Sequence, residues 1–99
     1  MVAFALAGGA SHAQSADRFI DANNLRIHYL DWGGGDKQPL ILLHGIAREA
    51  HTFDHLAPHF SPRFRVIAVD LRGHGDSAWD EQGAYMVEDY VADIEALVA

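Results

Sequence analysis

Two short, uninterrupted apolar runs place the strongest limit on how this chain can fold. Residues 40–43 read Leu-Ile-Leu-Leu, and residues 66–69 read Val-Ile-Ala-Val. Runs of this length without alternation are typical of strands that are buried on both faces, as in a parallel sheet. Between them, residues 50–60 carry apolar side chains at helical spacing. The sequence therefore predicts a β-strand, a crossover helix and a second parallel β-strand, a unit that is almost always right-handed.

The segments on either side complete an α/β pattern. Residues 18–22 and 25–30 favour strands, and Asn23-Asn24 between them is a turn signal because asparagine tolerates left-handed backbone. We therefore expect an antiparallel hairpin ahead of the parallel strands. An apolar stripe of helical period predicts a last helix, and it consists of Val87, Tyr90, Val91, Ile94, Leu97 and Val98. The predicted fold class is α/β: an antiparallel hairpin, a βαβ unit and a further helix.

Composition narrows the possible functions. The chain has 99 residues, of which 49% are hydrophobic and 21% charged, as expected for one small globular domain. Its formal net charge of -7 argues against nucleic-acid binding, which needs a basic face to neutralise phosphates. The chain has no cysteine, and this excludes disulfides, thiolate metal ligands and a cysteine nucleophile.

The first sixteen residues differ from the rest because they contain no charged side chain. Residues 2–10 form an apolar run of signal-peptide length, too short to span a bilayer, and Ser11 and Ala13 supply the small residues of a cleavage site. Our interpretation is a secretory leader that lacks its basic N-terminal region, which predicts a periplasmic or secreted protein without stable membrane insertion. The alternative is an alanine-rich disordered tail on a cytoplasmic protein.

Two motifs stand where the two apolar runs end. The first is Leu-Leu-His-Gly-Ile at residues 42–46, and the second is Val-Asp-Leu-Arg-Gly-His-Gly-Asp-Ser at residues 69–77. Ligands of open α/β sheets bind at the carboxyl ends of the strands, so either loop can border a site. The two motifs, in this order and with this spacing, resemble the α/β-hydrolase superfamily over residues 18–99.

The resemblance implies a reaction style but no particular substrate. Esterases, epoxide hydrolases, haloalkane dehalogenases, C–C bond hydrolases and lactonases share this N-terminal half. It implies a small-molecule substrate, a nucleophile–histidine–acid triad, and neither a cofactor nor a metal.

By the same resemblance, the first motif forms part of an oxyanion hole. One backbone N–H donor comes from the loop after the strand that ends in His-Gly, here Ile46 with Ala47 nearby. Gly45 is expected to let the backbone approach closely because it has no Cβ. His44 is expected to brace the loop without transferring protons. A plain strand-to-helix turn is the alternative.

The second motif is predicted to support the site. Gly73 and Gly75 permit a positive φ in a tight loop, and Asp70, Arg72 and Asp76 can satisfy the backbone there by hydrogen bonds. Ser77 is a poor candidate for a nucleophile because no strand-to-helix elbow holds it.

We expect the chain to be truncated ahead of its chemistry. The last helix carries no stop signal, and in the family the nucleophile, the acid and the histidine follow the next strand. No catalytic residue is therefore assigned within residues 1–99, and these residues alone are predicted to be inactive and poorly folded. The nucleophile can be serine or aspartate, and the sequence determines no oligomeric state. The alternatives are a non-catalytic ligand-binding protein of the same fold and an inactive gene fragment.

Three further patterns are weaker. Residues 73–78 match a relaxed dinucleotide-binding fingerprint, but no apolar helix follows, so we disfavour a nucleotide site. His51, His55 and His59 share one helical stripe, which we interpret as a solvated face and not a metal site, with Pro58 disturbing the last turn. Trp32 and Trp79 fit the mouth of a pocket or the core equally well.

Overall fold

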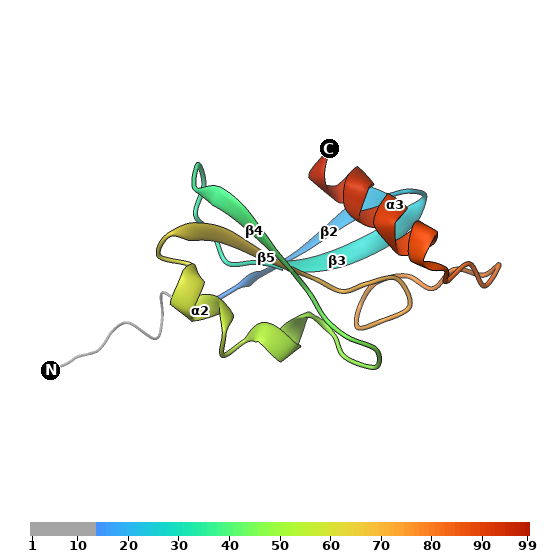
Figure 1. Ribbon diagram of the computed structural model, residues 1–99, viewed down its shortest axis with the longest axis horizontal. Helices are drawn as coiled ribbons and strands as arrows, with labels where there is room; N and C mark the ends of the chain where they lie inside the picture. The colour runs from blue at the N-terminus through green and yellow to red at the C-terminus, as the bar shows by residue number, and fades with distance from the viewer. Residues whose placement is uncertain (1–13) are drawn as a thin grey trace, which may run out of the picture.

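The computed structural model describes residues 14–99, and Figure 1 shows a twisted sheet with helices on both sides. In chain order the elements are β2 (Ala16–Ala22), β3 (Leu25–Asp31), β4 (Gln38–Leu43), the short 3-10 helix η1 (Ala50–Phe53), α2 (Ala57–Phe60), β5 (Phe64–Val69) and α3 (Val87–Val98). Most of the predicted leader lies outside the described residues. Its last residue, Ala16, already belongs to β2.

The predicted hairpin is confirmed. β2 pairs with β3 in antiparallel register from Ala16 opposite Asp31 to Ala22 opposite Leu25. Asn23 and Asn24 connect them with φ angles of 54° and 67°. Two consecutive left-handed residues make the turn whose twist matches the twist of the flanking strands, and asparagine adopts that conformation at low cost.

The predicted parallel pair is also confirmed, and the order of the strands is β2-β3-β5-β4. β4 and β5 pair in parallel along their whole length, from Gln38 opposite Phe64 to Leu43 opposite Val69. On its other side, β5 pairs antiparallel with the last three residues of β3, from Tyr29 opposite Val69 to Asp31 opposite Ile67. The sheet is therefore mixed, and β5 is a central strand although it is the last strand in sequence.

Two hydrophobic layers cover the faces of this sheet. Alternate residues of β5 point to opposite faces, as the pleat requires. Val66 and Ala68 pack with η1 and α2 in one cluster, and Val69 packs with α3 in the other. The chain thus forms a helix–sheet–helix arrangement (Figure 1).

None of the helices within residues 14–99 has the length and hydrophobicity that crossing a bilayer requires.

The single helix predicted over residues 50–60 is wrong, because η1 and α2 are separate one-turn helices. Pro58 lies in the first turn of α2 and not late in a longer helix. At that position its missing N–H costs nothing, because the first N–H groups of a helix have no acceptor within it. The proline therefore lies at the start of a helix, and the prediction that it disturbs the last turn of a longer helix is wrong.

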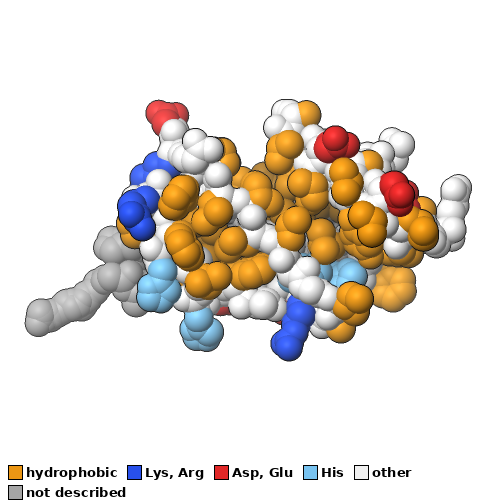
Figure 2. Space-filling model, in the orientation of Figure 1, with side chains coloured by type: hydrophobic (Ala, Val, Ile, Leu, Met, Phe, Trp, Pro, Cys, Tyr) orange, Lys and Arg blue, Asp and Glu red, His pale blue; other side chains and the backbone are white. Residues whose placement is uncertain are grey.

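Within residues 14–99, the prediction that residues 40–43 are buried on both faces is also wrong. In the sheet that these residues form, β4 is an outer strand, Leu40, Ile41 and Leu42 are half-buried, and Leu43 is 48% exposed. The stripe on α3 is likewise covered only in part, because Val87, Val91 and Val98 remain exposed. Figure 2, which has the orientation of Figure 1, shows hydrophobic side chains gathered on the face of the molecule that is turned to the viewer.

Candidate functional site

The two loops singled out in the sequence lie side by side. Leu43 and Val69, the last residues of β4 and β5, are directly opposite each other in the parallel register. The chain therefore leaves both strands at the same end of the sheet, where the carboxyl ends of β4 and β5 lie. Open α/β sheets bind their ligands at this end.

The first loop contains a tight turn from Gly45 to Arg48, closed by a hydrogen bond of 3.2 Å from the Arg48 N–H to the Gly45 carbonyl. Ala47, the third residue of the turn, has a φ of 63°, whereas the φ of Ile46 is not positive. This combination is that of a type II turn, which normally has glycine in the third position. The N–H groups of Ile46 and Ala47 donate to no acceptor within residues 14–99, and Ile46 is 93% exposed.

Within residues 14–99, Gly45 makes no close approach of the kind that we expected. Its φ lies outside the left-handed region, and a Cβ built on it would have no atom within 4 Å among the described residues. Contacts within this part of the chain therefore do not require a glycine at this position.

His44 ties the first loop to the second. Its side chain is buried, and its Nδ1 lies 2.7 Å from the Gly45 carbonyl oxygen. Because a carbonyl only accepts, Nδ1 carries the hydrogen, and Nε2 is free to accept the Leu71 N–H at 3.0 Å. The neutral ring thus uses both nitrogens for backbone hydrogen bonds, which supports a bracing role for His44.

Asp70 ties the second loop back to the first. One carboxylate oxygen accepts the Ala50 N–H at 2.6 Å, and the other accepts the Asp76 N–H at 2.9 Å and lies 2.6 Å from His28 Nδ1. Burial raises the pKa of Asp70, but these hydrogen bonds lower it by more, so its pKa lies below the ordinary value. Asp70 is therefore a buried carboxylate that holds three segments together.

The two glycines of the second motif adopt the predicted backbone. Gly73 and Gly75 have φ angles of 74° and 50°. A Cβ on Gly73 would come within 2.8 Å of the Tyr85 ring, and one on Gly75 would collide with the Asp70 carboxylate. Both positions therefore exclude larger residues for reasons of space as well as of backbone angle.

The other two polar residues of this motif act differently from each other. Arg72 is buried and satisfies the backbone as predicted, donating to the Ala84 carbonyl at 2.7 Å. Its main partner is Asp93 on α3, which accepts two hydrogen bonds of 2.7 Å each, and this pairing raises the pKa of Arg72. For Asp76 the prediction is wrong, because it contributes its own N–H while its carboxylate is exposed and bonds to no backbone group within residues 14–99.

The structure also brings together a histidine, an aspartate and a serine that imitate a catalytic triad. Ser77 Oγ donates to the Asp70 carbonyl at 2.6 Å and accepts the backbone N–H of His28 at 2.8 Å. The His28 ring does not hydrogen-bond to this hydroxyl, because its two nitrogens bond to Asp70 and, at 2.8 Å, to Asp17. Ser77 is 4% exposed, so it is buried and engaged, in agreement with its rejection as a nucleophile.

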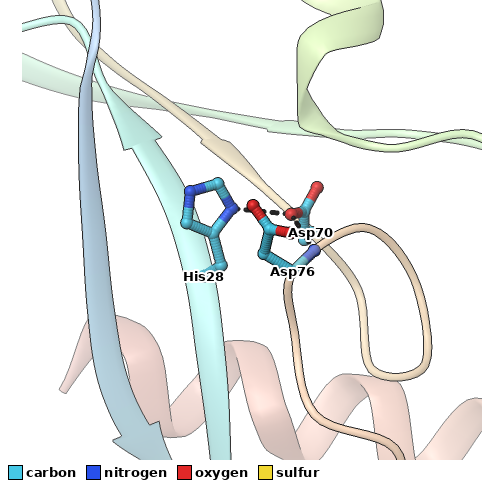
Figure 3. Close-up of side chains that lie close together, drawn as sticks. All are labelled: His28, Asp70 and Asp76. Atoms are coloured by element: carbon cyan, nitrogen blue, oxygen red, sulfur yellow. Dashed lines mark hydrogen bonds and ion pairs between the residues drawn. The ribbon is translucent and has the colours of Figure 1, made fainter.

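His28, Asp70 and Asp76 form the one group of three or more potential metal ligands in the described part of the chain (Figure 3). Figure 3 shows His28 reaching from β3 toward Asp70 at the end of β5. Both His28 nitrogens and both Asp70 oxygens already have hydrogen-bond partners. The group therefore fits a structural network better than an open coordination site. The sequence carries no signal for the role of His28, because it resembles any alternating residue of a strand.

The histidine stripe does not form on one helix. His51 lies on η1 and His59 on α2, and all three histidines are exposed. His51 lies 2.8 Å from Asp54, and this hydrogen bond raises the pKa of His51. The two tryptophans lie in different environments, since Trp32 is 8% exposed and belongs to the core, whereas Trp79 is 74% exposed.

A cavity of about 310 Å³ opens where the two loops meet. Its walls are residues of both loops and of the segment that leads into α3, namely His44, Gly45, Ile46, Leu71, His74, Tyr85 and Tyr90. An apolar groove of about 260 Å³ lies beside it between β4 and α3. The turn with unpaired N–H groups thus borders a cavity with aromatic walls, an arrangement suited to a small organic ligand.

Comparisons with known proteins agree with this geometry. The family model for the alpha/beta hydrolase fold matches residues 38–99, which contain both loops. The chain is 35% identical over 80 residues to epoxide hydrolase 4 of Mus musculus, which covers 80% of this chain and 22% of that protein. It is 40% identical over 77 residues to a non-heme chloroperoxidase of Burkholderia pyrrocinia, covering 77% of this chain and 27% of that protein.

A solved structure shows the same architecture. A membrane phospholipase A, described as a bacterial virulence factor, matches with a TM-score of 0.83 and 27% identity over 91% of this chain and 29% of its own. The chain therefore spans less than a third of the length of each of these relatives.

Proposed function

This chain belongs to the α/β-hydrolase family, and from that premise we propose that it forms the N-terminal part of a hydrolase that acts on an ester or a similar small organic substrate. The observation that carries the proposal is the turn from Gly45 to Arg48, whose Ile46 and Ala47 N–H groups have no acceptor within residues 14–99. Acyl transfer builds negative charge on an oxygen, and N–H groups that are fixed in advance stabilise that charge most effectively.

The bracing of this turn supports the proposal. His44 bonds to the backbone of the neighbouring loop, and Asp70 bonds from that loop to the residue that begins η1. The turn is therefore held between two hydrogen bonds that run in opposite directions, one buried and one partly buried. A turn held in this way does not have to reorganise when charge develops, which is the property that an oxyanion hole needs.

The proposal places the nucleophile, the acid and the catalytic histidine outside these 99 residues. The histidine, aspartate and serine that meet in the structure are buried. The His28 ring bonds to Asp70 and Asp17, and the Ser77 hydroxyl bonds to backbone groups, so they do not compete for these roles. The names of the relatives differ, since one is an epoxide hydrolase and another a chloroperoxidase. They support a reaction family and leave the substrate open.

The test replaces one N–H in the full-length protein. Ile46→Pro removes the donor, and proline is favoured at the second position of a type II turn, so the turn itself should persist. Ile46→Ala is the matched control, because it shortens the same exposed side chain and keeps the N–H. With 4-nitrophenyl butanoate as substrate, Ile46→Pro should lower kcat by about 10²–10³-fold, and Ile46→Ala should change it little.

Equal activity of the two variants would show that the Ile46 N–H is not an oxyanion donor. A full-length wild-type protein that binds small esters and epoxides without hydrolysing them would favour the alternative, a ligand-binding protein of this fold. The 99 residues alone should be inactive in either case, and turnover by the isolated chain would contradict the placement of the triad.

We extend the proposal to the uncharged first sixteen residues, within which we infer a leader that ends at Ala13 and directs export. The support is the apolar run followed by Ser11 and Ala13. N-terminal sequencing after expression in a secreting host should give a mature protein that begins at Gln14. A mature protein that still begins at Met1 would refute this part.

A further inference from the structure

We propose that His74 is a specificity-determining residue, whose Nε2 selects substrates that carry a hydroxyl or amide N–H donor near the reacting carbonyl. The inference rests on the proposed hydrolytic function and on the cavity that His74 and Ile46 both line. The resemblance implies no such role for this position, because it treats the whole second motif as support.

Two contacts hold the His74 ring. Its Nδ1 lies 2.9 Å from the Arg72 carbonyl oxygen, and the ring packs against His44 in a tilted arrangement, with centroids 4.9 Å apart and planes at 52°. The backbone of His74 is also tied, since its N–H donates to the Leu71 carbonyl at 2.9 Å. The ring is thus attached to the same structure that braces the turn from Gly45 to Arg48.

These contacts determine which nitrogen faces a ligand and what it offers. The Arg72 carbonyl can only accept, so Nδ1 carries the hydrogen, and in the neutral ring Nε2 is an acceptor. No group within residues 14–99 donates to Nε2. A polar atom of this kind in the wall of a cavity is satisfied only by water or by a ligand that brings a donor.

The other polar groups of the cavity do not provide this selectivity. The Tyr85 hydroxyl already accepts the Asp80 N–H at 2.8 Å. The Tyr90 hydroxyl both donates and accepts, so it satisfies a donor or an acceptor on the ligand equally. His44 uses both of its nitrogens on the backbone. His74 is therefore the one ring of the described cavity wall that accepts without donating.

The walls that the described residues supply favour an apolar body for the part of the ligand that they contact. Ile46, Leu71 and the two tyrosine rings are largely apolar, and the volume of about 310 Å³ is near the lower end of the roughly 300–1,000 Å³ found for ligand pockets. The class of substrate is a small, mainly apolar acyl compound with one hydrogen-bond donor on the side that faces the second loop.

The test compares two esters that differ by one hydroxyl, ethyl 3-hydroxybutanoate and ethyl butanoate, in the full-length protein. The wild type should show the higher kcat/KM for the hydroxylated ester. His74→Phe keeps an aromatic ring against His44 but has no acceptor, and it should lower the ratio of the two kcat/KM values about fivefold, the factor for one neutral hydrogen bond. His59→Phe, an exposed histidine on α2, is the control and should leave the ratio unchanged.

Each outcome decides between the possibilities. A wild type that prefers ethyl butanoate, or a ratio that His74→Phe does not change, overturns the proposal even if both esters are hydrolysed. If the wild type hydrolyses neither ester, the proposed ester hydrolysis fails, and calorimetric binding of 3-hydroxybutanamide against butanamide tests the site alone. Tighter binding of the hydroxylated amide would then support the role of His74, and equal binding would refute it.

Discussion

The Asp70→Asn substitution probes the hydrogen bond that holds the candidate oxyanion loop. The carboxylate accepts the Ala50 N–H through one oxygen and the Asp76 N–H through the other. Whichever way the new amide is turned, its NH2 group faces one of these two N–H groups. At least one hydrogen bond to a buried charged group is therefore lost, and the remaining bonds lose their charge.

The expected magnitude follows from these contacts. A hydrogen bond to a charged group contributes about 1.5–3 kcal/mol and a neutral one about 1 kcal/mol, so Asp70→Asn should lower the free energy of unfolding by about 2–4 kcal/mol. Urea denaturation of the full-length protein measures this change. Amide hydrogen exchange provides the local measurement, and the Ala50 amide should lose protection.

Asp36→Asn is the matched control, because it removes the same charge from an exposed side chain in the loop between β3 and β4, away from this network. It should alter the free energy of unfolding by less than about 0.5 kcal/mol. The reasoning is refuted if Asp70→Asn unfolds at the same urea concentration as the control and the Ala50 amide exchanges as slowly as in the wild type.

Two further predictions concern buried charge. Arg72→Met leaves Asp93 as an uncompensated buried carboxylate, so it should lower the free energy of unfolding in urea by about 3–5 kcal/mol. Arg72→Lys keeps the charge and should lower it by less. Equal stability of Arg72→Met and the wild type would contradict the role of this pair. Acid should also unfold the domain. Burial raises the pKa of Asp31, but hydrogen bonds from Arg65 and from the Gly33 N–H lower it by more, and the pKa of Asp70 is likewise lowered. A carboxyl group with a lowered pKa binds protons more readily in the unfolded chain, so its contribution is complete above the unfolded value of about 3.9 and is lost as the pH falls below it. Circular dichroism from pH 6 to pH 2 should show a loss of stability that begins near pH 4 and is smaller in Asp31→Asn, and a constant stability across this range would count against both carboxylates.

The sequence alone determined the elements whose cause is local. The paired left-handed asparagines predict the hairpin, and the helical stripe from Val87 predicts α3. The glycines at 73 and 75 predict a tight loop with positive φ, as observed. In each case the signal is a backbone preference or a periodicity over a few neighbouring residues, so it predicts the element without knowledge of distant contacts.

Only the tertiary structure decided how these elements meet. The position of β5 between β3 and β4 makes β4 the outer strand in the sheet of residues 14–99, where Leu43 is exposed, although both runs look equally apolar in sequence. The same arrangement brings His28 beside Asp70, and the packing of α3 brings Asp93 beside Arg72. These pairs are separated by 42 and 21 residues. Their energy depends on burial and on hydrogen bonds between strands and helices, which no local pattern encodes, and the loops of the candidate site are held by such contacts.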